Sequence, residues 1–220
     1  SVVTTSDAGA GIGYTGIRIR GVSAQSTNIT INGIPFNDPE SHGTFWVNLP
    51  DFTSSIESLQ VQRGVGTSTN GSGAFGASIN ILTDAVSENA NAEISNSLGS
   101  YNTRKHTVKF STGKINQFFE LSGRLSKIDS DGYVDRAYSD LKSYFLQASF
   151  QKGNTFLKAL SFGGHEKTYQ SWYGLTMDQV LENRRQNPYT YENEIDNYKQ
   201  DHYQFHWKQK HKPNLCANVC

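Results

Sequence analysis

Hydrophobic and polar residues alternate along three stretches in the second half of the chain. In residues 119–126, 143–150 and 202–207, aliphatic or aromatic side chains occupy nearly every second position and polar side chains stand between them. Successive side chains of a β-strand point to opposite faces, so this period of two predicts strands with one apolar and one polar face.

The connections between the predicted strands differ in length. Residues 113–116 and 153–154 make short connections, whereas residues 129–139 and 168–200 make long ones. Short turns at one end and long loops at the other are typical of barrels that cross outer membranes. A soluble antiparallel sheet with one face on a core has the same period and remains the alternative.

The first part of the chain has shorter apolar runs, broken by glycine, proline and asparagine. Asn48-Leu49-Pro50-Asp51 predicts the start of a brief helix, with Asn48 as its N-cap and Pro50 in its first turn. The polar residues 85–91 form a linker between this small mixed α/β unit, residues 1–84, and the strands of residues 92–220. The predicted short strands of the unit lie in residues 17–22, 29–34, 56–64 and 79–81.

Composition and charge narrow the class of protein. Hydrophobic residues make up 35% of the chain, aromatic residues 12%, and there are 20 glycines; this balance favours sheets with one apolar face over a large aliphatic core. No run approaches eighteen apolar residues, which excludes a transmembrane helix. The formal net charge of zero gives no basic surface for nucleic acid.

The residues with metal or redox chemistry are isolated. Cys216 and Cys220 are interpreted as incidental thiols, and His42 lacks further ligands at zinc spacing. Residues 129–135 superficially match a calcium loop, but Asp140 stands where that loop needs a bidentate Glu, so a plain exposed loop is favoured. We find no catalytic motif and predict neither an enzyme nor a cofactor. Within the second long loop, Thr176 to Arg185 predicts a short helix capped by Thr176.

Four blocks in residues 17–83 resemble one known family. They read I-R-I-R-G-V, I-T-I-N-G-I-P-F-N-D-P, I-E-S-L-Q-V-Q-R-G and G-S-G-A-F-G-A-S-I-N-I-L-T, in this order. They are similar to the second half of the plug domain of TonB-dependent outer-membrane receptors. The glycines Gly71, Gly73 and Gly76 match the small-residue stretch before the last plug strand in that family, where backbones approach closely.

This resemblance implies a fold and a domain organisation. We expect a mixed α/β plug domain in residues 1–84, lacking its N-terminal part, then the linker 85–91. Residues 92–220 would then supply the first five or six antiparallel strands of an incomplete 22-stranded transmembrane barrel, with extracellular loops. Because no signal peptide begins at Ser1, we interpret the chain as a piece of a longer protein.

The resemblance also implies roles for two arginines and for the exposed tips of the plug. Arg20 and Arg63 match plug arginines that face glutamates on the barrel wall, and Glu120 is the one candidate partner in this chain. Substrate contacts are expected at the plug apices and in the long loop, from Ser23, Gln25, Asn37, Asp38, Glu40, Ser41, His42, Phe45, Trp46, Tyr169, Trp172 and Tyr173.

The implied function is TonB-dependent uptake of a scarce solute across the outer membrane of a Gram-negative bacterium. An iron-siderophore chelate is the first candidate, and cobalamin, haem and oligosaccharides are others. The expected partners are TonB, through an N-terminal segment absent here, outer-membrane lipid and, for some cargoes, a surface lipoprotein; nucleic acid is not expected. The alternative is a secreted β-rich binding or adhesion module without transport activity.

Overall fold

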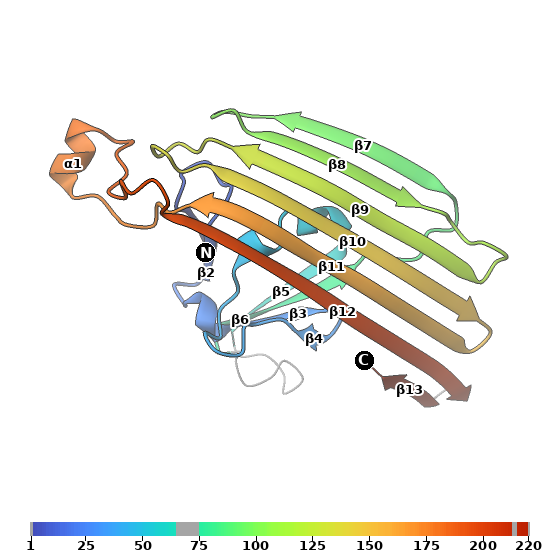
Figure 1. The fold of residues 1–220 in the computed structure, drawn as a ribbon. Coiled ribbons are helices and arrows are strands. Elements are labelled where there is room, and N and C mark those ends of the chain that lie inside the picture. The colour runs from blue at the N-terminus through green and yellow to red at the C-terminus, as the bar shows by residue number, and fades with distance from the viewer. Residues whose placement is uncertain (1, 65–74, 213–214, 220) are drawn as a thin grey trace.

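The structure is a computed structural model that describes residues 2–64, 75–212 and 215–219, and it contains three sheets (Figure 1). A two-stranded and a four-stranded sheet lie in the first part of the chain, and a seven-stranded sheet lies in the second. We call the described residues up to Thr83 the N-terminal unit and the seven-stranded sheet the wall. In Figure 1 the wall lies across the N-terminal unit and covers one side of it.

The N-terminal unit is built from short strands rich in β-branched residues, which favour extended backbone. In its larger sheet the strand order is β4-β3-β6-β5, with β3 and β6 parallel. Ile29, Ile31, Ile79 and Ile81 from this central pair form the core, together with Ile19. The strands are β1 (Val2–Ser6), β2 (Thr15–Ile19), β3 (Thr27–Ile31), β4 (Ile34–Pro35), β5 (Ile56–Arg63) and β6 (Ala77–Thr83).

The predicted helix at Asn48 is wrong in type and position. Two separate 3-10 turns stand there, η2 (Trp46–Asn48) and η3 (Phe52–Ser55), and a third, η1 (Ala24–Ser26), precedes β3. Asp51 interrupts the segment because its φ of 54° is left-handed, and Pro50 before it has no N–H to continue a helix.

The wall is an antiparallel meander in which each strand pairs with the next along the chain. It has seven strands, where the resemblance implied five or six. The first strand was hard to see in the sequence because Ile94 and Leu98 are its only large apolar residues. The strands are β7 (Asn91–Leu98), β8 (Arg104–Ser111), β9 (Phe119–Ser130), β10 (Ser139–Lys152), β11 (Thr155–Tyr169), β12 (Ile195–Lys212) and β13 (Leu215–Val219).

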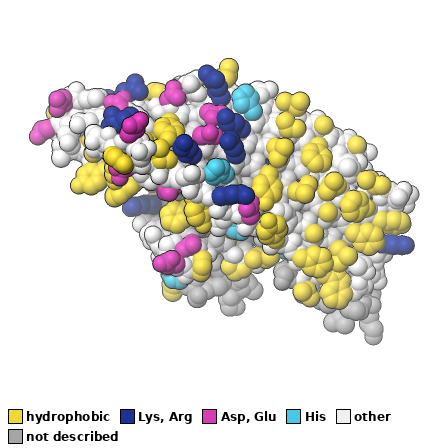
Figure 2. Space-filling model, in the orientation of Figure 1, with side chains coloured by type: hydrophobic (Ala, Val, Ile, Leu, Met, Phe, Trp, Pro, Cys, Tyr) yellow, Lys and Arg dark blue, Asp and Glu magenta, His cyan; other side chains and the backbone are white. Residues whose placement is uncertain are grey.

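The two faces of the wall differ as the alternation predicted. The inner face, which packs on the N-terminal unit, buries mostly hydroxyl and amide side chains: Thr107, Ser111, Ser122, Ser126, Ser143, Gln147 and Ser149. The outer face carries exposed apolar side chains, among them Phe119 at 41% exposure and Leu146 at 45%. In Figure 2 these side chains gather over one half of the outer face. The predicted polar and apolar faces are therefore confirmed.

A small apolar patch on the inner face departs from the polar pattern. Phe145 and Phe162 are almost fully buried there, and the ring of Phe52 from η3 lies 6.4 Å and 5.1 Å from theirs. Gly164 on β11 lets the backbone approach at this point, because a Cβ would stand 2.3 Å from the carbonyl oxygen of Asn48. The N-terminal unit is thus seated on the wall by close packing as well as by polar contacts.

The long connections all lie at one end of the wall, which we call the loop end (Figure 1). The predicted helix capped by Thr176 is confirmed as α1 (Met177–Glu182), where the Thr176 hydroxyl and the Gln179 side chain form a capping box. The loop between β9 and β10 also contacts the N-terminal unit, since the amides of Tyr133 and Val134 both donate to the Ala8 carbonyl, at 2.8 and 3.1 Å.

Some sequence predictions fall outside what the structure describes. Gly71, Gly73 and Cys220 are outside the described residues, and the side chain of Cys216, in β13, is not described. Gly76 is described, and a Cβ there would lie 2.4 Å from Val22. Among the described residues, the helices are all too short or too polar to span a bilayer.

Candidate functional site

A cavity of about 630 Å³ lies between one loop of the N-terminal unit and the inner face of the wall. The loop is residues 36–45, and the wall contributes β11 and β12. The lining residues are Tyr14, Ile34–Ser41, Gly43–Phe45, Asn48, Glu166, Asp196, Tyr198, Gln200 and His202–Gln204.

The loop on the N-terminal side of the cavity is held by its own polar side chains. Asn37 donates to the carbonyls of Thr27 and His42, both at 2.9 Å, and accepts from the Ile29 amide at 2.7 Å. Asp38 accepts from the Ser41 amide at 2.7 Å and the Ser41 hydroxyl at 2.9 Å. These bonds, the Ser41 amide first, lower the pKa of Asp38 below its usual value, so Asn37, Asp38 and Ser41 shape the loop.

Aromatic side chains give the cavity an apolar boundary. Phe36 lies against His202 of β12, with ring centroids 5.0 Å apart, and His202 stacks on Phe162 at 4.9 Å. Phe45 lines the cavity while 49% exposed. Trp46 lines instead a separate hollow of about 420 Å³ beside β1 and β2.

The wall side of the cavity contains a buried acid bound to a tyrosine. The Tyr14 hydroxyl donates to Glu166 at 3.1 Å and to Asp196, and Thr168 donates to the other oxygen of Glu166 at 2.5 Å. Burial, followed by the bond to Asp196, raises the pKa of Tyr14, so the hydroxyl stays protonated and keeps donating.

The polar residues of β12 complete the site. Tyr198, Gln200, His202 and Gln204 share its inner face, since each pairs with an inner-face residue of β11. Gln204 also accepts from the Asn32 side chain at 3.2 Å, which fixes one end of the cavity. Amide, phenol and carboxylate groups around an apolar rim suit a polar ligand.

Besides Trp46, Trp172 and Tyr173, four further predicted contact residues do not line the cavity. Ser23 and Gln25 are exposed at η1 and do not line the cavity, and His42 has a left-handed φ of 56° and offers its carbonyl to Asn37. Tyr169 is buried, with its hydroxyl donating to the Tyr191 carbonyl at 2.6 Å, so it anchors the long loop.

Trp172 and Tyr173 form an exposed aromatic cluster with Tyr189 in the long loop. The Trp172 ring lies 6.0 Å from that of Tyr173 and 5.8 Å from that of Tyr189. Both predicted residues are more than half exposed, so the cluster presents aromatic faces at the loop end, apart from the cavity.

The two predicted arginines are exposed, and Arg20 has a left-handed φ of 55°. In the part of the chain that the structure covers, neither makes an ion pair. Their candidate partner Glu120 instead accepts from the Ser111 hydroxyl at 2.8 Å and the Ser87 amide at 3.3 Å. Glu120 therefore holds the linker.

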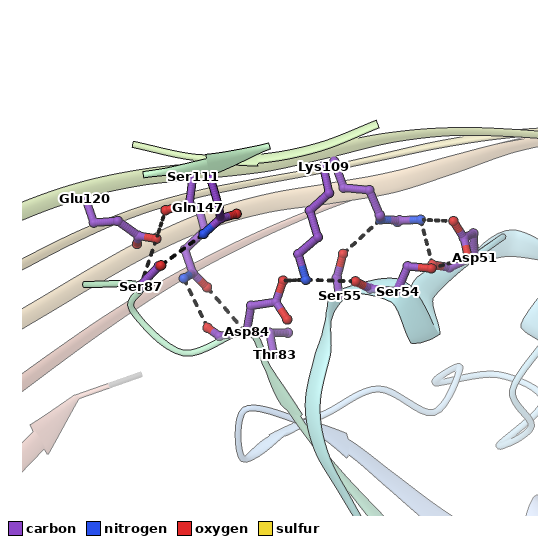
Figure 3. Close-up of polar contacts among 12 residues, drawn as sticks. Asp51, Ser54, Ser55, Thr83, Asp84, Ser87, Lys109, Ser111, Glu120 and Gln147 are labelled. Carbon is purple, nitrogen blue, oxygen red and sulfur yellow. Dashed lines mark hydrogen bonds and ion pairs between the residues drawn. The ribbon is translucent and has the colours of Figure 1, made fainter. Parts of the chain in front are cut away.

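A buried ion pair between the N-terminal unit and the wall has the opposite polarity, with an acid on the unit and cations on the wall (Figure 3). Asp51 pairs with Lys105 and, at 3.1 Å, with Arg124; the side chains of Asp51 and Arg124 are each 1% exposed. Ser126 and Thr107 donate to the same carboxylate at 2.7 and 2.8 Å.

The pKa of Asp51 reflects this environment. Burial raises it, but the bonds from Lys105, Ser54, Ser126 and Thr107 outweigh burial and bring the pKa down to about 2. The carboxylate therefore stays charged at neutral pH, as its pairing with a buried arginine requires.

A second set of contacts joins the end of β6 to the wall. Lys109 pairs with Asp84 at 2.6 Å, Gln147 donates to the Asp84 carbonyl at 3.1 Å, and Lys158 donates to the Thr83 hydroxyl at 2.8 Å. Figure 3 shows the contacts of Asp84 with Lys109 and Gln147 beside those of Asp51. Charged residues at the polar positions of β8, β9 and β11 were the available signal for this interface, and sequence reasoning did not use it.

Chemically, the arrangement offers polar groups that could bind a ligand. Among the described residues, no group of three histidine, cysteine, aspartate or glutamate side chains is placed to hold a metal ion. The polar groups converge on one open cavity and on the contact between two structural units.

Comparison with known proteins gives a family match for the first part of the chain. Residues 1–78 match the family model of the TonB-dependent Receptor Plug Domain. No curated protein has a significant sequence match to the chain.

Solved structures share the fold. The siderophore receptor PirA from Acinetobacter baumannii is 18% identical with a TM-score of 0.66, and the ferric-catecholate import receptor Fiu from E. coli K12 is 17% identical with a TM-score of 0.73; each match covers 94% of this chain and 33% of the other. FpvA of P. aeruginosa, in complex with a heterologous pyoverdine and iron, is 12% identical with a TM-score of 0.71, over 99% of this chain and 29% of FpvA. The chain thus spans about a third of the length of these receptors.

The predicted resemblance is therefore supported: residues 1–78 match the plug domain model of the TonB-dependent receptors, and from Asn91 onward the antiparallel strands share the fold of the solved receptor structures.

Proposed function

We propose that this chain is the plug and the first wall strands of an outer-membrane receptor that imports an iron chelate of the siderophore type by TonB-dependent transport. In this proposal residues 1–84 form the plug, residues 85–91 a linker and residues 92–220 the start of a barrel that closes with 22 strands. The receptor resides in the outer membrane of a Gram-negative bacterium and receives energy through TonB.

The observation that carries the proposal is the wall with two opposite faces. Its inner face is polar and holds the plug through the buried Asp51–Arg124 pair, and its outer face exposes aliphatic and aromatic side chains. A soluble sheet would bury its apolar face in its own core, whereas here the polar face is the one that is covered.

The cavity supports ligand binding at the loop end. Its volume of about 630 Å³ lies within the usual range of roughly 300–1,000 Å³ for small-molecule sites. Asp38, Glu40, Glu166 and Asp196 line it, and its described lining contains no lysine or arginine. We therefore expect neutral or cationic chelates to be preferred over highly anionic ones.

Uptake of radiolabelled iron chelates into cells tests the proposal. Cells expressing the full-length receptor should accumulate iron only while the inner membrane is energised and TonB is present. Gln200→Trp, which fills the cavity from β12, should reduce uptake at least about tenfold, since one large side chain blocks a shaped site. Gln209→Trp, on the outer face of the same strand, is the matched control and should leave uptake unchanged.

Two results would contradict the proposal. One is iron uptake that continues without TonB or is unaffected by Gln200→Trp. The other is release of the protein into the medium as a soluble species, which would support the alternative, a secreted binding or adhesion module.

A further inference from the structure

Two carboxylates of the wall converge on one atom of the plug in the cavity. The Tyr14 hydroxyl oxygen contacts Glu166 at 3.1 Å and also contacts Asp196. Asp196 pairs in register with Thr168, two residues from Glu166, so the two acids lie diagonally across the neighbouring strands β11 and β12. All three side chains at this point line the cavity.

The hydrogen-bond donors at this point do not match the two acids. A phenol has one hydrogen and no charge, so Tyr14 donates fully to only one carboxylate at a time. The further donors are also neutral, since Thr168 donates to Glu166 at 2.5 Å and Gln170 donates to Asp196 at 3.3 Å. Among the residues that the structure describes, no lysine, arginine or histidine forms an ion pair with either acid.

Glu166 is the acid for which the missing cation matters most. Its side chain is fully buried, and a buried carboxylate without a cation is costly. The described lining of the cavity has no lysine or arginine, and its histidine, His202, packs against the rings of Phe36 and Phe162. The described part of the wall and plug therefore supplies no cation that balances this pair of acids.

The convergence of the two acids indicates the kind of cation that fits. Because both contact a single heavy atom, the group between them has to be small and has to direct several donors from one atom. A primary ammonium does this with three N–H donors and a full charge on one nitrogen, whereas a guanidinium spreads its donors over a plane. Tyr198 stands opposite Glu166 in register and lines the cavity, so an aromatic ring is available to the same cation.

We infer that Glu166 and Asp196 select iron chelates that carry a primary ammonium group. The inference rests on the proposed function, which places the chelate in this cavity. The ammonium takes the place of the Tyr14 hydroxyl between the two carboxylates and donates to both, while the rest of the chelate lies beside residues 36–45. Glu166 and Asp196 are thus specificity-determining residues, and Tyr14 is the internal group with which the ligand competes.

Binding of three matched chelates to the full-length receptor in detergent tests this inference. The probes share one linear trihydroxamate core with radiolabelled ferric iron and differ only at the terminal nitrogen, which is a primary amine, its N-acetyl derivative or its trimethylammonium derivative. The wild type should bind the amine about ten- to a hundredfold more tightly than the acetylated chelate, as hydrogen bonds to charged groups predict. The trimethylammonium chelate keeps the charge without N–H donors and should lose most of this advantage.

Two variants assign the preference to these residues. Glu166→Gln combined with Asp196→Asn should bind the three chelates alike, since neither amide is charged. The preference is a ratio of affinities within one protein, so a partly misfolded sample does not imitate its loss. Tyr14→Phe removes the competing hydroxyl and should increase the preference for the amine. The control combines Asp178→Asn and Glu182→Gln, two exposed acids of α1 outside the cavity, and should keep the wild-type preference.

Three results would overturn the inference. The first is equal binding of the amine and the acetylated chelate by the wild type. The second is equally tight binding of the trimethylammonium chelate, and the third is a preference for the amine that persists when both acids are replaced by amides.

Uptake of the same chelates separates these results from failure of the proposed function. If only the inference fails, the acetylated chelate enters energised cells as well as the amine does, and Gln200→Trp blocks both. If the proposed function fails, neither chelate enters in a TonB-dependent way, and the inference falls with it.

Discussion

Asp51 contributes more to holding the plug against the wall than its neighbours on the same segment do. It accepts hydrogen bonds from Thr107 and Ser126 of the wall and pairs with the buried Arg124. Arg124 in turn donates to the Ser55 hydroxyl at 2.8 Å and to the Asp51 carbonyl at 2.6 Å. The charge of this carboxylate therefore compensates the buried guanidinium of Arg124.

Asp51→Asn should loosen the plug. Removing one partner of a buried pair leaves the other charge uncompensated and costs roughly 3–5 kcal/mol. Hydrogen exchange of the amides in β3 and β6 should report this loss as a lower free energy of local opening. Glu88→Gln, at a pair with Lys114 in which Glu88 is 70% exposed, should cost less than about 1 kcal/mol. Equal effects of the two substitutions would show that the buried pair has no special role.

Acid should weaken the same contact. The pKa of Asp51 is about 2, below its ordinary value of 3.8, so its contribution is present above pH 4 and is lost as the pH falls toward 2. A shift of this size corresponds to about 2 kcal/mol. Between pH 4.5 and pH 2, the wild-type plug should resist pepsin digestion better than the Asp51→Asn plug. This difference in resistance should shrink as the pH falls. A constant difference across that range would contradict the assignment.

At the residue scale, sequence reasoning selected a loop that lines the cavity but did not predict what its residues do there. Asn37, Asp38, Glu40, Ser41 and Phe45 do line the cavity. The hydrophobic pattern of the sequence cannot show that the Asn37 and Asp38 side chains form hydrogen bonds within their own loop. Such bonds depend on the path of the backbone around residues 36–43.

At the scale of elements, the wall and the plug approach each other closely where strand β11 meets the 3-10 turn η2. At Gly164 a Cβ would lie 2.3 Å from the Asn48 carbonyl oxygen and 2.6 Å from Pro50. These are backbone and ring atoms that cannot rotate away. The glycine is therefore required by contact, and its own φ is unremarkable for any residue.

Gly164→Ala should push η2 away from the wall and cost about 1–3 kcal/mol, as overpacking usually does. The expected signs are faster hydrogen exchange of the η2 and β3 amides and a lower thermal midpoint of the receptor. Gly174→Ala, in the long loop with nothing within 4 Å of its Cβ, is the matched control. If Gly164→Ala had as small an effect as this control, the close contact of β11 with Asn48 and Pro50 would be contradicted.

Strand prediction succeeded where one side of the strand was strongly apolar and failed where it was not. β9, β10 and β12 have Phe, Leu, Tyr or Trp on their outer face, whereas β7 has only Ile94 and Leu98. The helix expected at Asn48 failed for another reason: contacts of Asp51 with the wall hold it in a left-handed conformation that propensity does not anticipate.

For the whole molecule, the sequence predicted the plug family and the two faces of the wall, and could not predict the cavity. Tyr14 reaches Glu166 across 152 positions and Asp196 across 182. No local pattern in the sequence brings such distant residues together. The curvature of the wall over the plug does so (Figure 1), and it arises from the accumulated twist of seven paired strands.

The central claim is that the outer face of the wall meets lipid while the inner face meets the plug. Spin labels placed one at a time at residues 144–149 of the full-length receptor, in outer-membrane vesicles and a cysteine-free background, test it through collisions with oxygen and with a water-soluble nickel chelate. Labels at Tyr144, Leu146 and Ala148 should meet oxygen and exclude nickel, and labels at Phe145, Gln147 and Ser149 should be shielded from both. Equal accessibility at successive positions, or nickel contact at Leu146, would contradict the account.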